Sequence, residues 1–243
     1  MSTPTASELL GAWERGLEQP PHERAMTLLA AALPDAVGDE QARWSIGRRD
    51  AALLGLREQL FGGRLACVTN CAGCGEPLEM DFTTSDISLP HAVSDSVAFS
   101  FAGDDGDYEV ELRLPNTLDL RALAGTPDIG RLFRRCVTAV TRDGETRRVE
   151  DDLPPGLGEE VSRRAESADP QARVELQLLC PACGQEWIAP FDIVSFLWGE
   201  INAWAERTLR EIHLLASSYG WGEAEILALS PQRRRHYLRM VTA

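Results

Sequence analysis

Two short cysteine motifs are the residues of this 243-residue chain that are best suited to chemistry. Cys71 and Cys74 lie in CAGCGEPLEMDF, and Cys180 and Cys183 lie in CPACGQEWIAPF. In both motifs a glycine follows the second cysteine directly, and a phenylalanine comes seven residues after that glycine. Each motif is typical of a zinc knuckle, because thiolates are good zinc ligands and glycine allows the positive φ of a tight turn.

A structural zinc site needs four tetrahedral ligands, and each motif offers two. We therefore predict that Cys71, Cys74, Cys180 and Cys183 together bind one structural Zn²⁺ as the two halves of a split zinc ribbon. Roughly 100 residues separate the halves, against about 15 to 20 in a compact ribbon. Closing the longer loop costs roughly 1.5 to 2 kcal/mol more. This cost is small beside the apparent 10 to 16 kcal/mol or so of structural zinc binding.

Other roles for the thiols are weaker interpretations of the same residues. A catalytic zinc would keep an open position and usually include histidine, and none of the four histidines lies near either motif in the sequence. A thioredoxin-like enzyme would need a single pair near the start of a helix. Redox-inert thiols without a metal remain an alternative. Cys67 and Cys136 are expected to be ordinary reduced thiols.

The elements before the second motif mix helices and strands. The first third predicts helices, the last of which begins after Ser45 and ends at Gly62. The alternating segment SVAFSFAGDDGDYEVELRLP predicts a β-hairpin, whose acidic turn lacks the ligand spacing of a calcium loop. The segments NTLDLRALAG and PDIGRLFRRCVTAVTRDG are expected to form two helices. A strand, ARVELQLL, then leads into the second motif.

The last part of the chain has the longest helical periodicity. Apolar residues recur at helical spacing from Asp192 to Tyr219, and two short helices follow, the last of them basic. Aromatic residues and arginine are enriched in protein interfaces. The candidate partner-binding residues are Trp198, Trp204, Tyr219, Trp221, Arg233, Arg234 and Arg235. The alternative is that the aromatic side chains belong to the core and the arginines are solvated.

These elements predict an α+β fold that is mostly helical, with a split four-cysteine zinc ribbon and an inserted β-hairpin and helix subdomain. The expected parts are an N-terminal helical region (1–63), the zinc ribbon (64–90 with 171–191), the inserted subdomain (91–170) and the C-terminal long and short helices (192–243).

Composition limits the possible functions. The net charge of −14 argues against nucleic acid as the main ligand, because phosphate binding needs a basic surface. All 24 basic residues are arginine, so a Schiff-base lysine and a P-loop lysine are both excluded. No membrane span and no signal peptide are expected. No hydrolase, metalloprotease or nucleotide-binding motif is present, so we expect no enzyme and no small-molecule substrate.

Several stretches resemble one known family. The strongest are FDIVSFLWGEINAWA and HLLASSYGWGEAEILALSPQRRRHYL, and the likeness continues upstream through SIGRRDAALLGLREQLFG, CAGCG and ELRLPNTLDLRALAG. They are similar to baseplate hub-associated or hub assembly proteins of contractile phage tails and phage tail-like contractile injection systems. The resemblance implies a part of the tail baseplate, or a factor that assembles it, with other baseplate or hub subunits as partners.

We therefore expect a non-enzymatic structural or assembly component of a contractile tail-like machine, acting as a zinc-stapled protein–protein interaction module. Its expected location is the cytoplasm or an assembled tail-like particle. The alternatives from other classes are a zinc-ribbon nucleic-acid-binding protein, which the net charge opposes, and a dithiol redox enzyme.

Overall fold

The computed structural model describes residues 2–34, 40–91, 94–104, 106–126, 128–147 and 154–241. The fold is α+β with mostly helical secondary structure and small antiparallel sheets, as the sequence predicts. Contacts divide the chain into two compact units. The first unit comprises Met1–Asp35 and Val194–Ala243, and the second comprises Ala36–Ile193.

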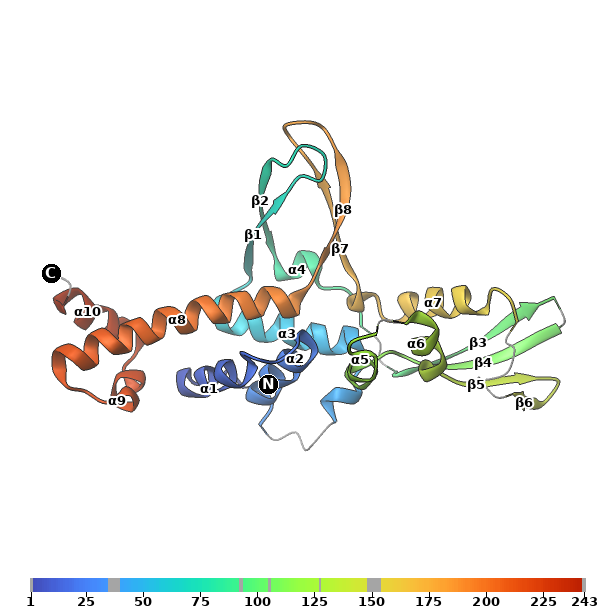
Figure 1. Ribbon diagram of the computed structural model, residues 1–243, viewed down its shortest axis with the longest axis horizontal. Helices are drawn as coiled ribbons and strands as arrows, with labels where there is room; N and C mark the ends of the chain where they lie inside the picture. Colours follow the sequence, from blue (N-terminus) through green and yellow to red (C-terminus); the bar gives the residue numbers. More distant parts are fainter. Residues whose placement is uncertain are drawn as a thin grey trace. The chain divides into compact units, whose positions relative to one another are not determined.

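The first unit is helical (Figure 1). Its helices are α1 (Ala6–Gly16), α2 (Pro21–Ala32), α8 (Ile193–Tyr219, which begins in the last residue of the second unit), α9 (Glu223–Ala228) and α10 (Pro231–Val241). Helix α8 confirms the long helix that the apolar periodicity of residues 192–219 predicts. Its buried residues Ala205, Ile212 and Leu215 form a core with Leu10 of α1 and Ile226 of α9.

The second unit contains both cysteine motifs, each at the turn of a two-stranded antiparallel hairpin. Its elements before the four-stranded sheet are η1 (Gln41–Arg43), α3 (Ile46–Phe61), β1 (Arg64–Asn70), β2 (Pro77–Thr83) and α4 (Thr84–Ile87). The sheet has the order β3 (Ser96–Gly103), β4 (Gly106–Arg113), β5 (Val137–Arg142) and β6 (Glu145–Arg147). The remaining elements are α5 (Thr117–Leu123), α6 (Ile129–Cys136), α7 (Leu157–Ala168), η2 (Pro170–Ala172), β7 (Val174–Leu179) and β8 (Glu186–Phe191).

Helix α3 has the ends that its sequence predicts. The Ser45 side chain accepts a hydrogen bond from the backbone N–H of Arg48 at 3.2 Å, and Gly62 follows the helix with a φ of 87°. Near its start, the backbone N–H of Gly47 donates to the buried carboxylate of Asp169 at 2.8 Å. A Cβ atom at Gly47 would overlap this carboxylate. The residues just before β7 are thereby fixed against α3.

The segment 137–142 corrects one expectation. The sequence predicts this segment as part of the helix that begins near Asp128, whereas in the structure α6 ends at Cys136 and strand β5 follows directly. Val137, Thr138, Val140 and Thr141 are β-branched, and such side chains favour strands over helices. The inserted part of the chain therefore contains a four-stranded sheet and not a hairpin alone.

The core of this sheet is formed with α6 and α7. Its buried members are Phe99, Tyr108, Val110, Leu112, Cys136, Val137, Val140, Leu157 and Val161. The alternation of Tyr108, Val110 and Leu112 on β4 places all three on the buried face. Both helices therefore cover the same side of the sheet.

Candidate metal centre

The first cysteine motif forms a tight turn between β1 and β2. The backbone N–H of Cys71 donates to the carbonyl of Glu76, and the N–H of Gly75 donates to the carbonyl of Cys71, both at 2.9 Å. Gly75 has a φ of 76°, in the left-handed region that glycine adopts without a steric penalty. This turn directs the side chains of Cys71 and Cys74 to the same end of the hairpin.

The second motif repeats this turn between β7 and β8. The backbone N–H of Cys180 donates to the carbonyl of Gln185, and the N–H of Gly184 donates to the carbonyl of Cys180, again at 2.9 Å. Gly184 has a φ of 72°. The internal repeat of the sequence therefore corresponds to two turns with the same hydrogen bonds.

The two turns face each other, and the two hairpins lie side by side (Figure 1). The Sγ atoms of Cys71 and Cys183 are 3.7 Å apart, as are those of Cys74 and Cys180, and all four Sγ atoms lie within 4.8 Å of one another. A tetrahedral zinc site with Zn–S distances of about 2.3 Å has S···S distances of about 3.8 Å. The separations are far beyond the roughly 2.05 Å of a disulfide bond. The donor set and its spacing therefore fit a tetrahedral metal ion.

The cluster is half shielded from solvent. Cys71 and Cys180 are buried, whereas Cys74 and Cys183 are exposed. The backbone N–H of Gly73 donates to the Cys71 sulfur at 3.3 Å, and a Cβ atom at Gly73 would lie only 3.3 Å from the Gln185 side chain. The turns are thus packed against each other at the cluster.

The thiols influence one another's protonation. Hydrogen bonds from the backbone N–H groups of Cys74 and Gly73 lower the pKa of Cys71 to about 6. The N–H of Glu76 lowers the pKa of Cys74, but the hydrogen bonds of the neighbouring thiols of Cys183, Cys180 and Cys71 outweigh it, and this pKa is raised to about 12. Four thiols at this spacing cannot all lose their protons unless a cation offsets the negative charge. A bound divalent ion would supply that charge.

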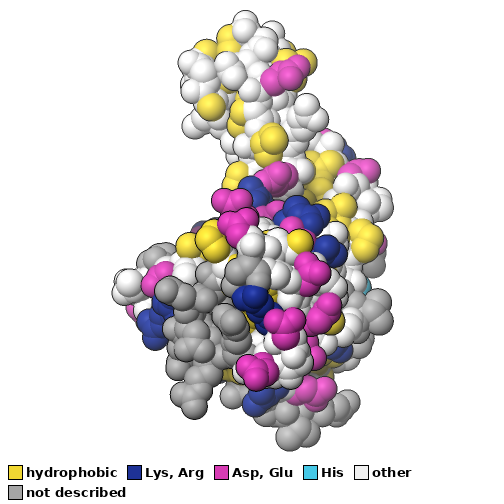
Figure 2. All heavy atoms as spheres, turned by 90° about the vertical axis from the view of Figure 1, so that its right-hand side faces the viewer, with side chains coloured by type: hydrophobic (Ala, Val, Ile, Leu, Met, Phe, Trp, Pro, Cys, Tyr) yellow, Lys and Arg dark blue, Asp and Glu magenta, His cyan; other side chains and the backbone are white. Residues whose placement is uncertain are grey.

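The two hairpins support the centre through a shared apolar layer. The rings of Phe82 and Phe191, the two phenylalanines of the sequence repeat, meet edge to face with centroids 5.8 Å apart. The opposite faces of the hairpins expose apolar side chains, with Val68 69%, Leu179 59% and Ile188 63% exposed. Figure 2 shows hydrophobic side chains on the surface of the hairpins, at the top of the view.

The other two cysteines lie outside the cluster. Cys67 is half-buried on β1, and Cys136 is buried at the end of α6. Burial, together with the negative charge of Asp119, raises the pKa of the Cys136 thiol to about 11. Cys136 is therefore protonated at neutral pH and unsuited to metal binding or nucleophilic chemistry.

The candidate partner-binding residues of the first unit have different environments. Trp198 and Arg234 are buried, Trp204 and Trp221 are half-buried, and Tyr219, Arg233 and Arg235 are exposed. The ring of Trp198 lies against Gly16, and the guanidinium group of Arg24 lies over it, 4.6 Å from the centroid. Arg234 forms an ion pair with Glu211 at 2.9 Å. Trp198 and Arg234 thus lie in the interior of this unit.

Tyr219 and Trp221 belong to a cluster of three aromatic rings. They are stacked with centroids 4.7 Å apart, and Tyr237 of α10 meets Trp221 edge to face at 4.9 Å. Sequence reasoning missed Tyr237. The helical spacing of Tyr237, Leu238 and Val241 in the basic C-terminal segment is the signal that could have found it. The side chain of Tyr219 remains 39% exposed.

The chain belongs to the T4 bacteriophage base plate protein family, whose model matches residues 8–198. The matched part includes both cysteine motifs and everything between them. Comparison with curated proteins and with solved structures finds no match. Among the helices of the described residues, none combines the length and the apolar character needed to cross a bilayer.

Proposed function

We propose that this chain is a structural or assembly component of the baseplate of a contractile tail-like machine, acting at the hub as a zinc-stapled interaction module. The family match supports the baseplate assignment. The observation that supports the zinc staple is the convergence of four cysteine sulfurs from two hairpins into one cluster, in which all four lie within 4.8 Å of one another.

A zinc ion at this centre would be held by Cys71, Cys74, Cys180 and Cys183. When bound, it would supply the positive charge that four thiolates require. The chain's own residues provide two matching turns, a shielded pair of sulfurs and a shared apolar layer beneath them. The staple would fix the ends of the long inserted segment, so that residues 91–170 act as a subdomain held at both ends.

The proposed role is structural and not catalytic. Four cysteine ligands complete the tetrahedral coordination of zinc and leave no position for water or a substrate. The exposed side chains of Tyr219, Arg233 and Arg235 are candidate contacts to neighbouring subunits, because Tyr and Arg are enriched at energetically important interface positions. The net charge of −14 favours a partner with a basic surface.

Metal analysis of the purified chain tests the zinc staple. We expect one zinc per chain by inductively coupled plasma mass spectrometry, retained on dialysis against a weak chelator. A preparation that folds with no bound metal, or that binds zinc with an unchanged stoichiometry after Cys183→Ser, contradicts the staple.

Affinity purification tests the baseplate role separately. A tagged chain is expressed in cells that assemble the tail-like particle. We expect other baseplate subunits to co-purify with it, and hub subunits to be the most strongly enriched by mass spectrometry. Enrichment of peripheral baseplate subunits without hub subunits contradicts the hub position. Recovery without any baseplate subunit contradicts the baseplate role itself.

A further inference from the structure

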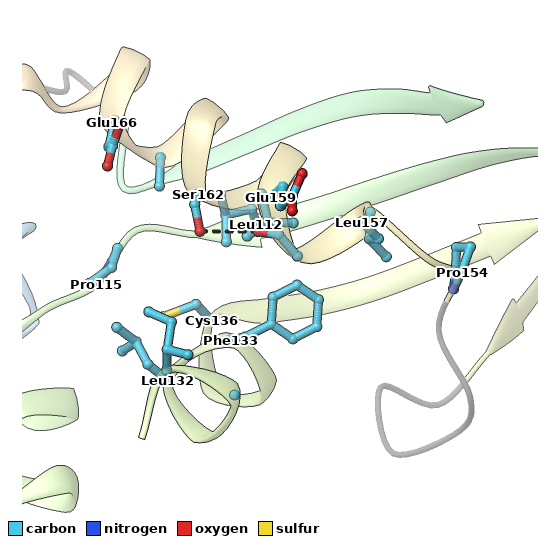
Figure 3. A pocket seen from close by; sticks show the side chains of 15 residues that line it. Leu112, Pro115, Leu132, Phe133, Cys136, Pro154, Leu157, Glu159, Ser162 and Glu166 are labelled. Carbon is cyan, nitrogen blue, oxygen red and sulfur yellow. Dashed lines mark hydrogen bonds between the residues drawn. The ribbon is translucent and has the colours of Figure 1, made fainter. Parts of the chain in front are cut away.

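An apolar groove lies between α6 and α7, over the four-stranded sheet of the second unit. Its volume is about 590 Å³, within the range of sites that bind ligands. The lining residues that are apolar include Leu112, Ile129, Leu132, Phe133, Leu157 and Val161. Figure 3 shows Leu132, Phe133 and Cys136 on one side of the groove and Leu157 and Ser162 on the other.

Helix α6 presents more apolar surface than the core uses. Ile129, Leu132, Phe133 and Cys136 follow the helical spacing of a single apolar face. Cys136 is buried, but Leu132 and Phe133 are only half-buried, and Ile129 is 75% exposed. A groove with an apolar face that extends from the core to the surface is typical of sites that bind an amphipathic helix of another protein.

The charged residues along the groove define the charge of its occupant. Glu159 and Glu166 of α7 are exposed, and no arginine is among the described lining residues. Glu166 forms only a solvent-exposed ion pair with Arg173, at 3.1 Å, and such pairs contribute little energy. The charged residues that line the groove and the net charge of the chain are therefore both negative, and both favour an occupant with Lys or Arg beside its apolar residues.

Two other occupants fit the groove less well. A small molecule needs convergent polar groups that orient it, and the Ser162 hydroxyl in the groove donates to the carbonyl of Gly158 at 3.0 Å. A second copy of this chain offers α10 as its basic helix. Tyr237, Leu238 and Val241 of α10 pack against its own core, and Met240 is the large apolar side chain that α10 exposes.

We propose that this groove binds the apolar face of an amphipathic helix of another baseplate subunit, and that a Lys or Arg of that helix lies beside Glu159 and Glu166. The proposal rests on the proposed function, because it takes its partner from the assembled baseplate. Apolar side chains of the partner at positions i, i+3 or i+4, and i+7 would lie along the groove.

Site-specific photo-crosslinking in cells that assemble the particle tests this proposal. A benzoylphenylalanine at Ile129 keeps an apolar side chain at the rim, and the matched control places it at Arg163, which is exposed on α7 and is not part of the groove lining. We expect crosslinks from position 129 to one other baseplate subunit, with a yield at least about tenfold above that from position 163. Peptide mapping should place the crosslink on an amphipathic helix with basic residues.

A variant that fills the groove makes the test independent of the crosslinking position. A Cβ atom at Gly158 meets open space, so Gly158→Leu should extend into the groove without disturbing the fold, and leucine favours the helix by roughly 1 kcal/mol over glycine. Gly199→Leu is the matched control, because this exposed helical glycine also has open space around it and lies in the first unit. We expect Gly158→Leu to reduce the crosslink about tenfold, and Gly199→Leu to leave it unchanged.

Charge reversal tests the acidic rim. Glu159→Arg should reduce the crosslink severalfold, whereas Glu14→Arg, at an exposed site on α1, should not. A crosslink from position 129 to a second copy of this chain, or none while the chain is present in baseplate fractions, overturns the groove proposal alone. Absence of the chain from every baseplate fraction instead contradicts the proposed function.

Discussion

The Sγ atoms of Cys71 and Cys183 lie 3.7 Å apart although 112 positions separate them in the sequence. The four-stranded sheet and the four α-helices α4 to α7 lie between them in the chain. A metal that joins these sulfurs would therefore restrict the conformations of a very long segment. The loss of one ligand should lower the stability of that whole segment and not only of the turn that carries the ligand.

The first prediction concerns the ligands. Cys71→Ser and Cys183→Ser should each lower the zinc content well below one per chain and lower the free energy of unfolding by several kcal/mol, because structural zinc contributes strongly to the stability of small sites. Cys67→Ser, on the same hairpin but outside the cluster, is the matched control and should retain zinc. Metal analysis and chemical denaturation provide the two measurements. Equal zinc contents in Cys67→Ser and Cys183→Ser would contradict the assignment.

The second prediction concerns a buried carboxylate on α3. Burial raises the pKa of Asp50 to about 6, although the neighbouring Arg49 opposes the shift through a contact of 2.8 Å. The negative charges of Asp192 and Asp169 contribute to this rise. Since the folded pKa lies above the unfolded value, the stability that Asp50 contributes is fully present below about pH 4 and is lost as the pH rises through about 6.

Asp50→Asn removes this titration. The stability of the variant relative to the unchanged protein should rise by about 2 kcal/mol between pH 4.5 and pH 7.5, measured by urea denaturation. The control Asp143→Asn, at a carboxylate that is 88% exposed, should show a much smaller change. Asparagine also tolerates the positive φ of 52° at that position. Parallel pH profiles for the Asp50 variant and the unchanged protein would exclude the buried titration.

The third prediction concerns Asp119, whose side chain is 0% exposed. Burial by itself would raise its pKa, but hydrogen bonds from Arg113, from the backbone N–H of Asn116 and from Arg135 hold the pKa below its usual value. Its contribution to stability is therefore present at neutral pH and is lost as the pH falls through the lowered pKa.

Asp119→Ala should cost about 3 kcal/mol at pH 7, because it removes one half of the capping box of α5 and leaves two arginines without their shared carboxylate. Glu160→Ala is the comparison, since Glu160 also pairs with two arginines but does so on an exposed face of α7. Its cost should be less than about 1 kcal/mol. Thermal or urea unfolding measures the loss of stability in both variants. Similar losses in the two variants would contradict the importance of burial at Asp119.

The fourth prediction concerns the contact of Gly16 with Trp198. A Cβ atom at Gly16 would overlap the indole ring, and the guanidinium of Arg24 lies over the same ring, 4.6 Å from its centroid. Gly16→Ala should therefore destabilise the protein by about 1 to 3 kcal/mol through overpacking. Gly199→Ala, at a helical glycine with open space, should stabilise it by about 0.5 to 1 kcal/mol. A stabilising effect at Gly16, read from the denaturation midpoint, would contradict the close packing.

The elements that the sequence predicts correctly are those with local signals. The turns at Gly75 and Gly184 follow from the residues on either side of them, and the ends of α3 follow from Ser45 and Gly62. The convergence of the two turns was predictable for a different reason, because two cysteines cannot complete a tetrahedral site and a second pair was available.

The features that the sequence does not predict depend on tertiary packing. Strand β5 follows α6 without a turn residue between Cys136 and Val137, so the sequence contains no signal that ends the helix. The strand is defined by its pairing with β4, which is a tertiary contact. The groove requires α6 and α7 to lie on the same face of one sheet, and their sequences lie on opposite sides of β5 and β6. The burial of Trp198 likewise depends on Gly16, which is far from it in the chain.

The unequal exposure of the four sulfurs has a consequence for the lifetime of the centre. Each turn contributes one sheltered sulfur, Cys71 or Cys180, and one sulfur open to water, Cys74 or Cys183. Oxidants and competing chelators would therefore reach the outer pair first. If the four sulfurs hold a metal ion as proposed, its loss should be stepwise and should start at the two exposed sulfurs.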